Sequence, residues 1–265
     1  MLKVYLVQMD SAKGSKSENL ARAKKMILEA HPTEGSLVLL PEMFATGYLP
    51  ANLDDAAEEF SSNAAGETAR TLSEIAEATN CTIMGAGITR APDGFFNHVS
   101  IYEPNNAQET AGYNKMNLFF PERDAFTPGD GINLFTIQNW KIASFICYDL
   151  RFPEIFRDAT KQGANLITIQ AAWPAKRRAH WETLLKARAI ENQVYIAAVN
   201  AVSTTPDQKA PLAGSSLIIT PNGDVITQGP TNEEAVLSAE LDLQAEKNYR
   251  KSFPVLDGIV HPDLI

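Results

Sequence analysis

Three reactive side chains follow three predicted β-strands of this chain. Glu42 comes after the apolar run SLVLLP, Lys115 after TAGYN, and Cys147 after IASFI. A thiol of ordinary pKa is only a few per cent ionised at neutral pH, so a cysteine nucleophile needs a base or a nearby cation. A carboxylate can take the thiol proton, and an ammonium group can stabilise developing negative charge. The three residues therefore form a candidate set for nucleophilic catalysis.

Each member of this set also has a structural explanation. Free cysteines are among the most buried residues, and a Glu or Lys at a strand end is often simply solvated. Cys81 illustrates the difference, because it begins the apolar run CTIMGAGI with no polar cluster after it and is expected to be a core residue. What favours catalysis is the conjunction, because functional residues of α/β sheets gather at the carboxyl ends of strands.

A cysteine–histidine pair has little support. His180 shares a helical stripe with Leu184 and Ala187 in AHWETLLKARAI, and His98 lies inside the predicted strand FFNHVSIY. Packing or capping explains both histidines. The carboxylate and the ammonium group of the candidate set could together take the place of a histidine.

Strand and helix patterns alternate along the whole chain, which predicts an α/β fold with mixed sheets. Residues 17–30 read as a helix with Ser17 as its N-cap, and Asn222–Gly223 marks a β-hairpin within residues 215–229. No linker divides the chain, so residues 1–265 are expected to form one domain. Periodicity alone leaves open whether two sheets pack face to face or one doubly wound sheet forms.

Composition excludes several classes of protein. The net charge of −9 and the lack of a basic cluster larger than AKRR argue against nucleic-acid binding. No apolar run reaches the roughly 18 residues of a membrane span, and the N-terminus lacks a signal-peptide pattern. Two cysteines and four dispersed histidines form no disulfide framework or zinc motif. We expect a reduced, cytoplasmic protein without metal or cofactor and without membrane or nucleic-acid partners.

Three blocks of the sequence, LLPEMFATGY, YNKMNLF and ICYDLRFPE, resemble the signature blocks of the nitrilase (carbon–nitrogen hydrolase) superfamily. FTPGD, HWETLLKARAIENQVYIAAVN and GSSLIITPNGDV are similar to further parts of that family, in the expected order. The resemblance implies a four-layer α-β-β-α sandwich that dimerises through a helical face. It also implies roles for five residues: a general base at Glu42, an oxyanion stabiliser at Lys115, the nucleophile Cys147, a second active-site glutamate at Glu122, and an oxyanion donor in the backbone N–H of Tyr148.

Within the superfamily, the chain looks most like the omega-amidases, which release ammonia from small dicarboxylic monoamides such as 2-oxoglutaramate and 2-oxosuccinamate through a cysteine thioester. The expected partners are this small amide and water. N-carbamoyl hydrolases, aliphatic amidases, nitrilases and an inactive scaffold of the same fold remain alternatives. Many relatives have histidine where this chain has Asn117. Four residues are candidates for the substrate pocket: Phe152, Trp173, Arg177 and Arg178.

Overall fold

The computed structural model describes residues 1–11, 15–60, 66–205 and 210–258. Within these ranges the strands form two six-stranded sheets. Sheet A is built from β1 (Leu2–Gln8), β2 (Leu37–Leu39), β3 (Thr82–Ala91), β4 (Gly94–Tyr102), β5 (Ala111–Asn114) and β12 (Ala235–Leu241). Sheet B is built from β6 (Leu134–Ile137), β7 (Trp140–Ile146), β8 (Leu166–Ala171), β9 (Tyr195–Asn200), β10 (Leu217–Ile219) and β11 (Val225–Gln228).

Both sheets are mixed and follow the same pairing pattern. Sheet A has the order β12-β1-β2-β3-β4-β5, in which β2 pairs in parallel with β1 and β3 and the other neighbours are antiparallel. Sheet B has the order β11-β10-β9-β8-β7-β6, in which β8 pairs in parallel with β7 and β9. The strands β2 and β8 thus occupy equivalent places in the two sheets. Each of them is followed by a loop that contributes to the site described below.

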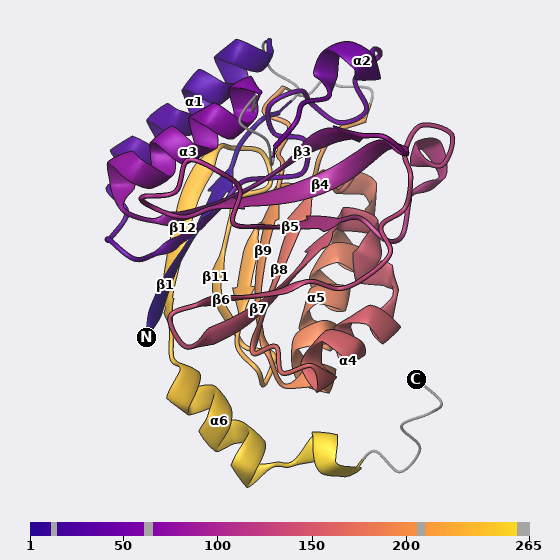
Figure 1. The fold of residues 1–265 in the computed structure, drawn as a ribbon. Helices are drawn as coiled ribbons and strands as arrows, with labels where there is room; N and C mark the ends of the chain where they lie inside the picture. Colours follow the sequence, from indigo (N-terminus) through magenta and orange to yellow (C-terminus); the bar gives the residue numbers. More distant parts are fainter. Residues whose placement is uncertain (12–14, 61–65, 206–209, 259–265) are drawn as a thin grey trace.

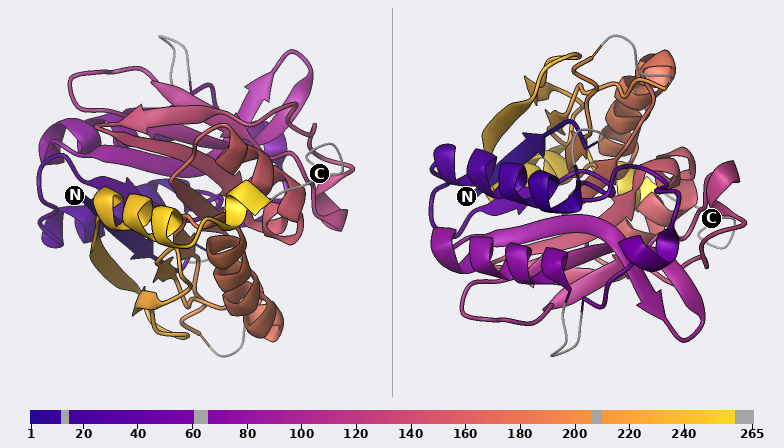
Figure 2. Two further views of the ribbon diagram at one scale, coloured as in Figure 1. Left: turned by 90° about the horizontal axis from the view of Figure 1, so that it is seen from below. Right: turned by 90° about the horizontal axis from the view of Figure 1, so that it is seen from above.

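Helices cover the outer side of each sheet. The helices α1 (Lys16–Glu29) and α3 (Glu67–Thr79) lie together on sheet A, whereas α4 (Pro153–Lys161) and α5 (Arg178–Asn192) lie together on sheet B (Figures 1 and 2). The short α2 (Leu53–Ala56) follows the loop after β2. The last helix, α6 (Leu243–Ser252), extends from the end of β12 at the bottom of Figure 1. The resulting order of layers is α-β-β-α, as the sequence resemblance implied.

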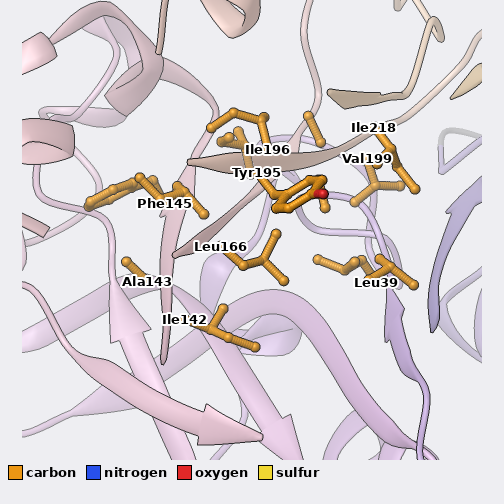
Figure 3. Close-up of a cluster of buried hydrophobic side chains, with 14 of the residues drawn as sticks. Leu39, Ile142, Ala143, Phe145, Leu166, Tyr195, Ile196, Val199 and Ile218 are labelled. Atoms are coloured by element: carbon orange, nitrogen blue, oxygen red, sulfur yellow. The ribbon is translucent and has the colours of Figure 1, made fainter. Parts of the chain in front are cut away.

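The apolar core between the sheets holds them face to face. Leu39 from β2 lies among side chains from β7, β8, β9 and β10, including Ile142, Leu166, Val199 and Ile218 (Figure 3). These side chains are fully buried. Full burial of one Leu or Ile contributes about 1.5–3 kcal/mol, so this shared cluster stabilises the pairing of the sheets.

The start of α1 differs from the prediction. Ser15, not Ser17, is the N-cap: its hydroxyl accepts from the Glu18 N–H, and the Glu18 carboxylate accepts from the Ser15 N–H at 2.6 Å. The reason is the spacing of the capping box, because Glu18 stands three residues after Ser15, whereas Leu20 stands three residues after Ser17. The predicted hairpin at Asn222–Gly223 is confirmed as β10–β11, with Gly223 at φ 92°.

None of the helices in the described parts of the chain combines the length and apolar character that a bilayer crossing requires.

Candidate active site

The carboxylate and the ammonium group of the candidate set come from sheet A. Glu42 lies three residues beyond β2, and Lys115 directly follows β5. The Lys115 N–H donates to the Asn97 carbonyl at 2.9 Å, so the ladder between β4 and β5 continues up to the lysine. The two side chains meet inside the molecule, where Lys115 is 1% exposed and Glu42 is fully buried.

The thiol comes from sheet B. Cys147 is the first residue after β7 and begins a short 3₁₀ helix, Cys147–Arg151, with φ at 46°. Positive φ is uncommon for a residue with a side chain and costs free energy, so it persists only where the surroundings enforce it. The sharp turn directs the chain from the end of β7 toward Pro153, where α4 begins.

Lys115 joins two buried glutamates. Its Nζ lies 2.8 Å from Glu42 Oε1 and 2.8 Å from Glu122 Oε1, and all three side chains are shielded from solvent. The second oxygen of each carboxylate accepts a backbone N–H: Glu42 Oε2 from Ala172 at 2.9 Å, and Glu122 Oε2 from Phe119 at 2.7 Å. Ala172 follows β8, so sheet B orients the carboxylate that sheet A supplies. Buried charges need such complete pairing because their desolvation is costly.

The electrostatics favour a protonated lysine and a neutral thiol. Burial alone would lower the pKa of Lys115, but the charges of Glu42, Cys147 and Glu122 raise it overall. Burial, and then the charge of Glu42, raise the pKa of the Cys147 thiol well above its ordinary value, although Lys115 opposes them. Glu42 is thus the carboxylate whose charge acts most strongly on the thiol. The arrangement therefore suits removal of the thiol proton by Glu42 during attack, rather than a thiolate formed in advance.

A buried carboxyl group links the lysine loop to the cysteine turn. Asp149 Oδ1 accepts from the backbone N–H of Asn117 at 2.8 Å and from its Nδ2 at 2.9 Å. Asp149 Oδ2 accepts from the Tyr113 hydroxyl at 2.8 Å and from the Ile146 N–H at 3.0 Å. Asn117 thus supplies a side-chain donor at the position where the sequence resemblance leads one to expect histidine.

Replacing Asn117 with Ala is expected to lower the free energy of unfolding by about 1.5–3 kcal/mol, because a buried carboxyl group loses a charge-assisted hydrogen bond. Turnover should fall as well, because Lys115 and Cys147 lose part of the link between their loops. Urea unfolding measures the first effect. Asn133→Ala is the control, since Asn133 donates at 2.8 Å to a neutral carbonyl in an exposed position. Equal losses for the two variants would contradict the assigned link.

Cys147 opens into a cavity of about 330 Å³. Four aromatic side chains line it, namely Tyr48, Phe119, Tyr148 and Trp173, as do three basic ones, namely Arg151, Lys176 and Arg177. No Asp or Glu is among its described lining residues. The lining of the cavity therefore combines apolar and aromatic side chains with three positive charges.

Two of the four predicted pocket residues line this cavity and two do not. Trp173 and Arg177 are lining residues. Phe152 instead packs its ring against Tyr148 at 5.4 Å, and Arg178 lies 3.9 Å from Glu182 with its side chain 46% exposed. Arg178 begins α5 and lies on its exposed face. In the described part of the chain, neither Phe152 nor Arg178 lines the cavity.

The described histidines lie outside this cavity. His180 is exposed on α5, and His98 hydrogen bonds with Glu109 and Asn114. His261 falls outside the described residues. In the described ranges, no three His, Cys, Asp or Glu side chains are grouped to hold a metal ion.

Sequence reasoning missed several residues of the site, among them Arg151, Tyr48 and Asn97. Arg151 ends the short 3₁₀ helix that begins at Cys147. Tyr48 lines the cavity from the end of the sequence block LLPEMFATGY that contains Glu42. Asn97 contacts both glutamates. Its signal was a polar residue in phase with the apolar Val99 and Ile101 of one strand.

Comparison with known proteins agrees with this geometry. Residues 3–251 match the carbon-nitrogen hydrolase family. The chain is 36% identical to a 2-oxoglutaramate amidase of Bacillus subtilis (strain 168) over 260 residues, covering 97% of this chain and 96% of that protein. It is 33% identical to the omega-amidase NIT2 of Xenopus tropicalis, covering 91% and 88% of the two chains.

A solved structure has the same fold. The crystal structure of XC1258 from Xanthomonas campestris, a CN-hydrolase superfamily protein with an arsenic adduct in its active site, superposes with a TM-score of 0.86 at 29% identity and covers 97% of each chain. The family match over nearly the whole chain and the two relatives above 30% identity agree. This chain belongs to the carbon-nitrogen hydrolase family.

Proposed function

We propose that this protein is an omega-amidase-like hydrolase that releases ammonia from a small amide carrying a distal carboxylate, such as 2-oxoglutaramate or 2-oxosuccinamate. One observation carries the proposal: a cysteine beside a buried glutamate–lysine pair opens into a cavity lined by three basic side chains and no described acidic one. The relatives named as 2-oxoglutaramate amidase and omega-amidase support the same substrate class.

The proposed reaction has two halves. Cys147 Sγ attacks the amide carbon while Glu42 takes the thiol proton, and the resulting oxyanion is stabilised by the Lys115 ammonium and the Tyr148 N–H. The C–N bond then breaks as Glu42 passes the proton to the leaving nitrogen, which releases ammonia and leaves a thioester. Glu42 next takes a proton from water, whose oxygen attacks the thioester carbon. The carboxylic acid leaves, and the proton returns to the thiol.

Glu122 keeps the charge of Lys115 in place during this cycle. When Glu42 becomes protonated, Lys115 retains an ionised partner at 2.8 Å in Glu122. Burial raises the pKa of Glu122, and Lys115 opposes that effect. The ammonium group therefore stays oriented while the base changes its protonation state.

Arg151 is the proposed partner of the distal carboxylate. Its guanidinium group lies 4.6 Å from the centre of the Trp173 ring, which orients it by a cation–π contact. Burial, and then the charge of Arg177, lower the pKa of Arg151. Two cations that repel each other at the side of a cavity would be stabilised by an anion between them, and a guanidinium can bind a carboxylate through two hydrogen bonds.

Replacing Arg151 with Met is expected to raise KM for 2-oxoglutaramate by about 10- to 100-fold, the value of one hydrogen-bonded charge pair. KM for a neutral aliphatic amide of similar length should change little, because that substrate has no carboxylate to bind. Steady-state ammonia release measures both constants. The control is Arg178→Met, which removes an exposed arginine outside the cavity and should leave both KM values unchanged. A larger effect on the neutral amide would exclude carboxylate recognition.

A substrate panel tests the function itself. Ammonia release is measured with 2-oxoglutaramate, 2-oxosuccinamate, an N-carbamoyl amino acid, an aliphatic amide and a nitrile, with Cys147→Ala as the blank. The proposal requires the two dicarboxylic monoamides to give the highest kcat/KM. Preference for the N-carbamoyl amino acid would favour the second candidate, which also carries a carboxylate for Arg151. Activity on nothing in the panel would contradict the proposed function and favour the inactive scaffold of the same fold.

We also propose that the protein works in the cytoplasm as a homodimer joined through a helical face. The apolar side chains of Ile190 on α5 and Phe253 after α6 are about half exposed, at 49% and 58%. Light scattering of the purified protein measures the assembly.

A further inference from the structure

Asn97 bridges the carboxylates of Glu42 and Glu122 in the same way as Lys115 does. Its Nδ2 donates to Glu42 Oε1 at 2.7 Å and to Glu122 Oε1 at 3.1 Å. These are the same two oxygens that Lys115 Nζ contacts at 2.8 Å each. The two carboxylate oxygens and the two donor nitrogens form a closed ring, and Asn97 is fully buried.

The fold directs the Asn97 side chain to this place. Side chains alternate along a strand, so Asn97 shares a face of β4 with Val99 and Ile101, which belong to the core between the sheets. His98 points to the opposite face. A polar side chain on the interior face of a strand is costly unless its hydrogen bonds are made.

The balance of charges in this ring explains why uncharged donors stabilise it. Glu42 and Glu122 carry two negative charges when both are ionised, and Lys115 supplies a single positive charge. Two carboxylates that share one site disfavour each other's ionised form, so the pair tends to hold a proton. A primary amide has two N–H hydrogens, one for each carboxylate, and adds no charge of its own.

The orientation of the amide is settled by its neighbours. Turning it over would place the carbonyl oxygen against two carboxylate oxygens, which is repulsive. In the observed orientation Asn97 Oδ1 has no hydrogen-bond partner among the described residues. An unpaired buried carbonyl is unfavourable. The two N–H donors of Asn97 are therefore what this position requires, even though the carbonyl oxygen stays unpaired.

We propose that Asn97 is a positioning residue that lets one lysine hold two ionised glutamates, and thereby keeps Glu42 able to accept the thiol proton. The inference rests on the proposed function only in taking Glu42 as the base. The other titratable groups that face this ring are Cys147 and Tyr48, which interact electrostatically with both glutamates, and Asp149, which interacts with Lys115.

Asn97→Leu tests the proposal, because leucine has the same branched arrangement of heavy atoms and no donor. We expect kcat to fall about 10- to 100-fold, which is within the contribution of a general base, while KM changes less than about threefold. The acid limb of the kcat/KM profile should move to higher pH, because a carboxylate pair without the amide donors holds its proton more tightly. Asn97→Asp adds a third carboxylate and should move that limb further.

The matched control is Asn192→Leu. Asn192 is also fully buried, and its Oδ1 also has no partner among the described residues, but it lies on α5 and donates to the Arg188 carbonyl. This variant should lose stability and keep the wild-type pH profile. An unchanged acid limb in Asn97→Leu would overturn the proposal. If Asn97→Leu does not fold, Asn97→Ser replaces it: a hydroxyl has one donor, so the shift should be smaller than that of Asn97→Asp and still measurable.

A second measurement needs no substrate and so separates this inference from the proposed function. The melting temperatures of wild type and Asn97→Leu are compared from pH 5 to 8. The difference should widen as pH rises, because the missing donors matter only when both carboxylates are ionised. The difference for Asn192→Leu should stay constant. A constant difference for Asn97→Leu would overturn the inference even if the enzyme proves to act on another amide.

Discussion

Replacing Cys147 with Ala is expected to reduce turnover of every substrate by about 10⁴-fold or more, to the level of the blank. Loss of the nucleophile removes covalent catalysis altogether, and the remaining groups of such a site act poorly without it. Among the described residues that line the cavity, no second thiol and no serine or threonine hydroxyl is available to replace it. Ammonia release under saturating substrate measures the effect.

The fold should survive this change. Cys147 is 8% exposed and faces the cavity, and alanine can adopt its φ of 46° at a similar cost. The melting temperature is therefore expected to stay within a few degrees of wild type. Cys81→Ala is the control, because Cys81 is fully buried against α3 and sheet A and should leave kcat unchanged. Ammonia release by Cys147→Ala at more than about 1% of the wild-type rate would refute the assignment of the nucleophile.

Lys115→Met should have the second largest effect. Turnover is expected to fall at least about 10²-fold, because the oxyanion loses a charged partner that is itself buried. The variant also leaves Glu42 and Glu122 buried without their cation, and breaking a buried ion pair costs about 3–5 kcal/mol. Calorimetry and urea unfolding measure the stability.

The loss of stability in Lys115→Met is expected to grow with pH. Without Lys115, the glutamate pair binds protons more tightly in the folded state than in the unfolded chain. Stability then falls as pH rises through the raised folded-state pKa, so the deficit of Lys115→Met against wild type should be small near pH 4.5 and large at pH 8. Lys24→Met removes a surface pair with Glu74 and should show a small, nearly constant difference. A deficit that shrinks with rising pH would contradict the charge assignment.

The sequence predicted the parts of the site whose residue types are unusual where they stand. A glutamate, a lysine and a cysteine at strand ends are visible without a structure, and so is the hairpin at Asn222–Gly223. The structure brings Glu42, Lys115 and Cys147 together; their roles are what the variants measure.

Other parts depend on packing that no local pattern encodes. The Ala172 N–H reaches Glu42 only because the two sheets dock, and the choice between two sheets and one could not be made from periodicity. Arg151 lines the cavity, and not Arg178, because the turn at Cys147 folds back toward Trp173 while α5 carries Arg178 outward. Such placements follow from tertiary geometry.

The hydrogen bond from Ala172 to Glu42 joins residues 130 positions apart in the chain. Contacts of such long range close late in folding, because the entropy of the intervening chain must be lost first. A folding intermediate with both sheets formed but undocked would expose the thiol to alkylation and leave the carboxylate without its fixed orientation. During refolding, the rate at which ammonia release returns therefore reports the rate of docking of the two sheets. The rate at which the circular dichroism signal returns reports the formation of the strands and helices.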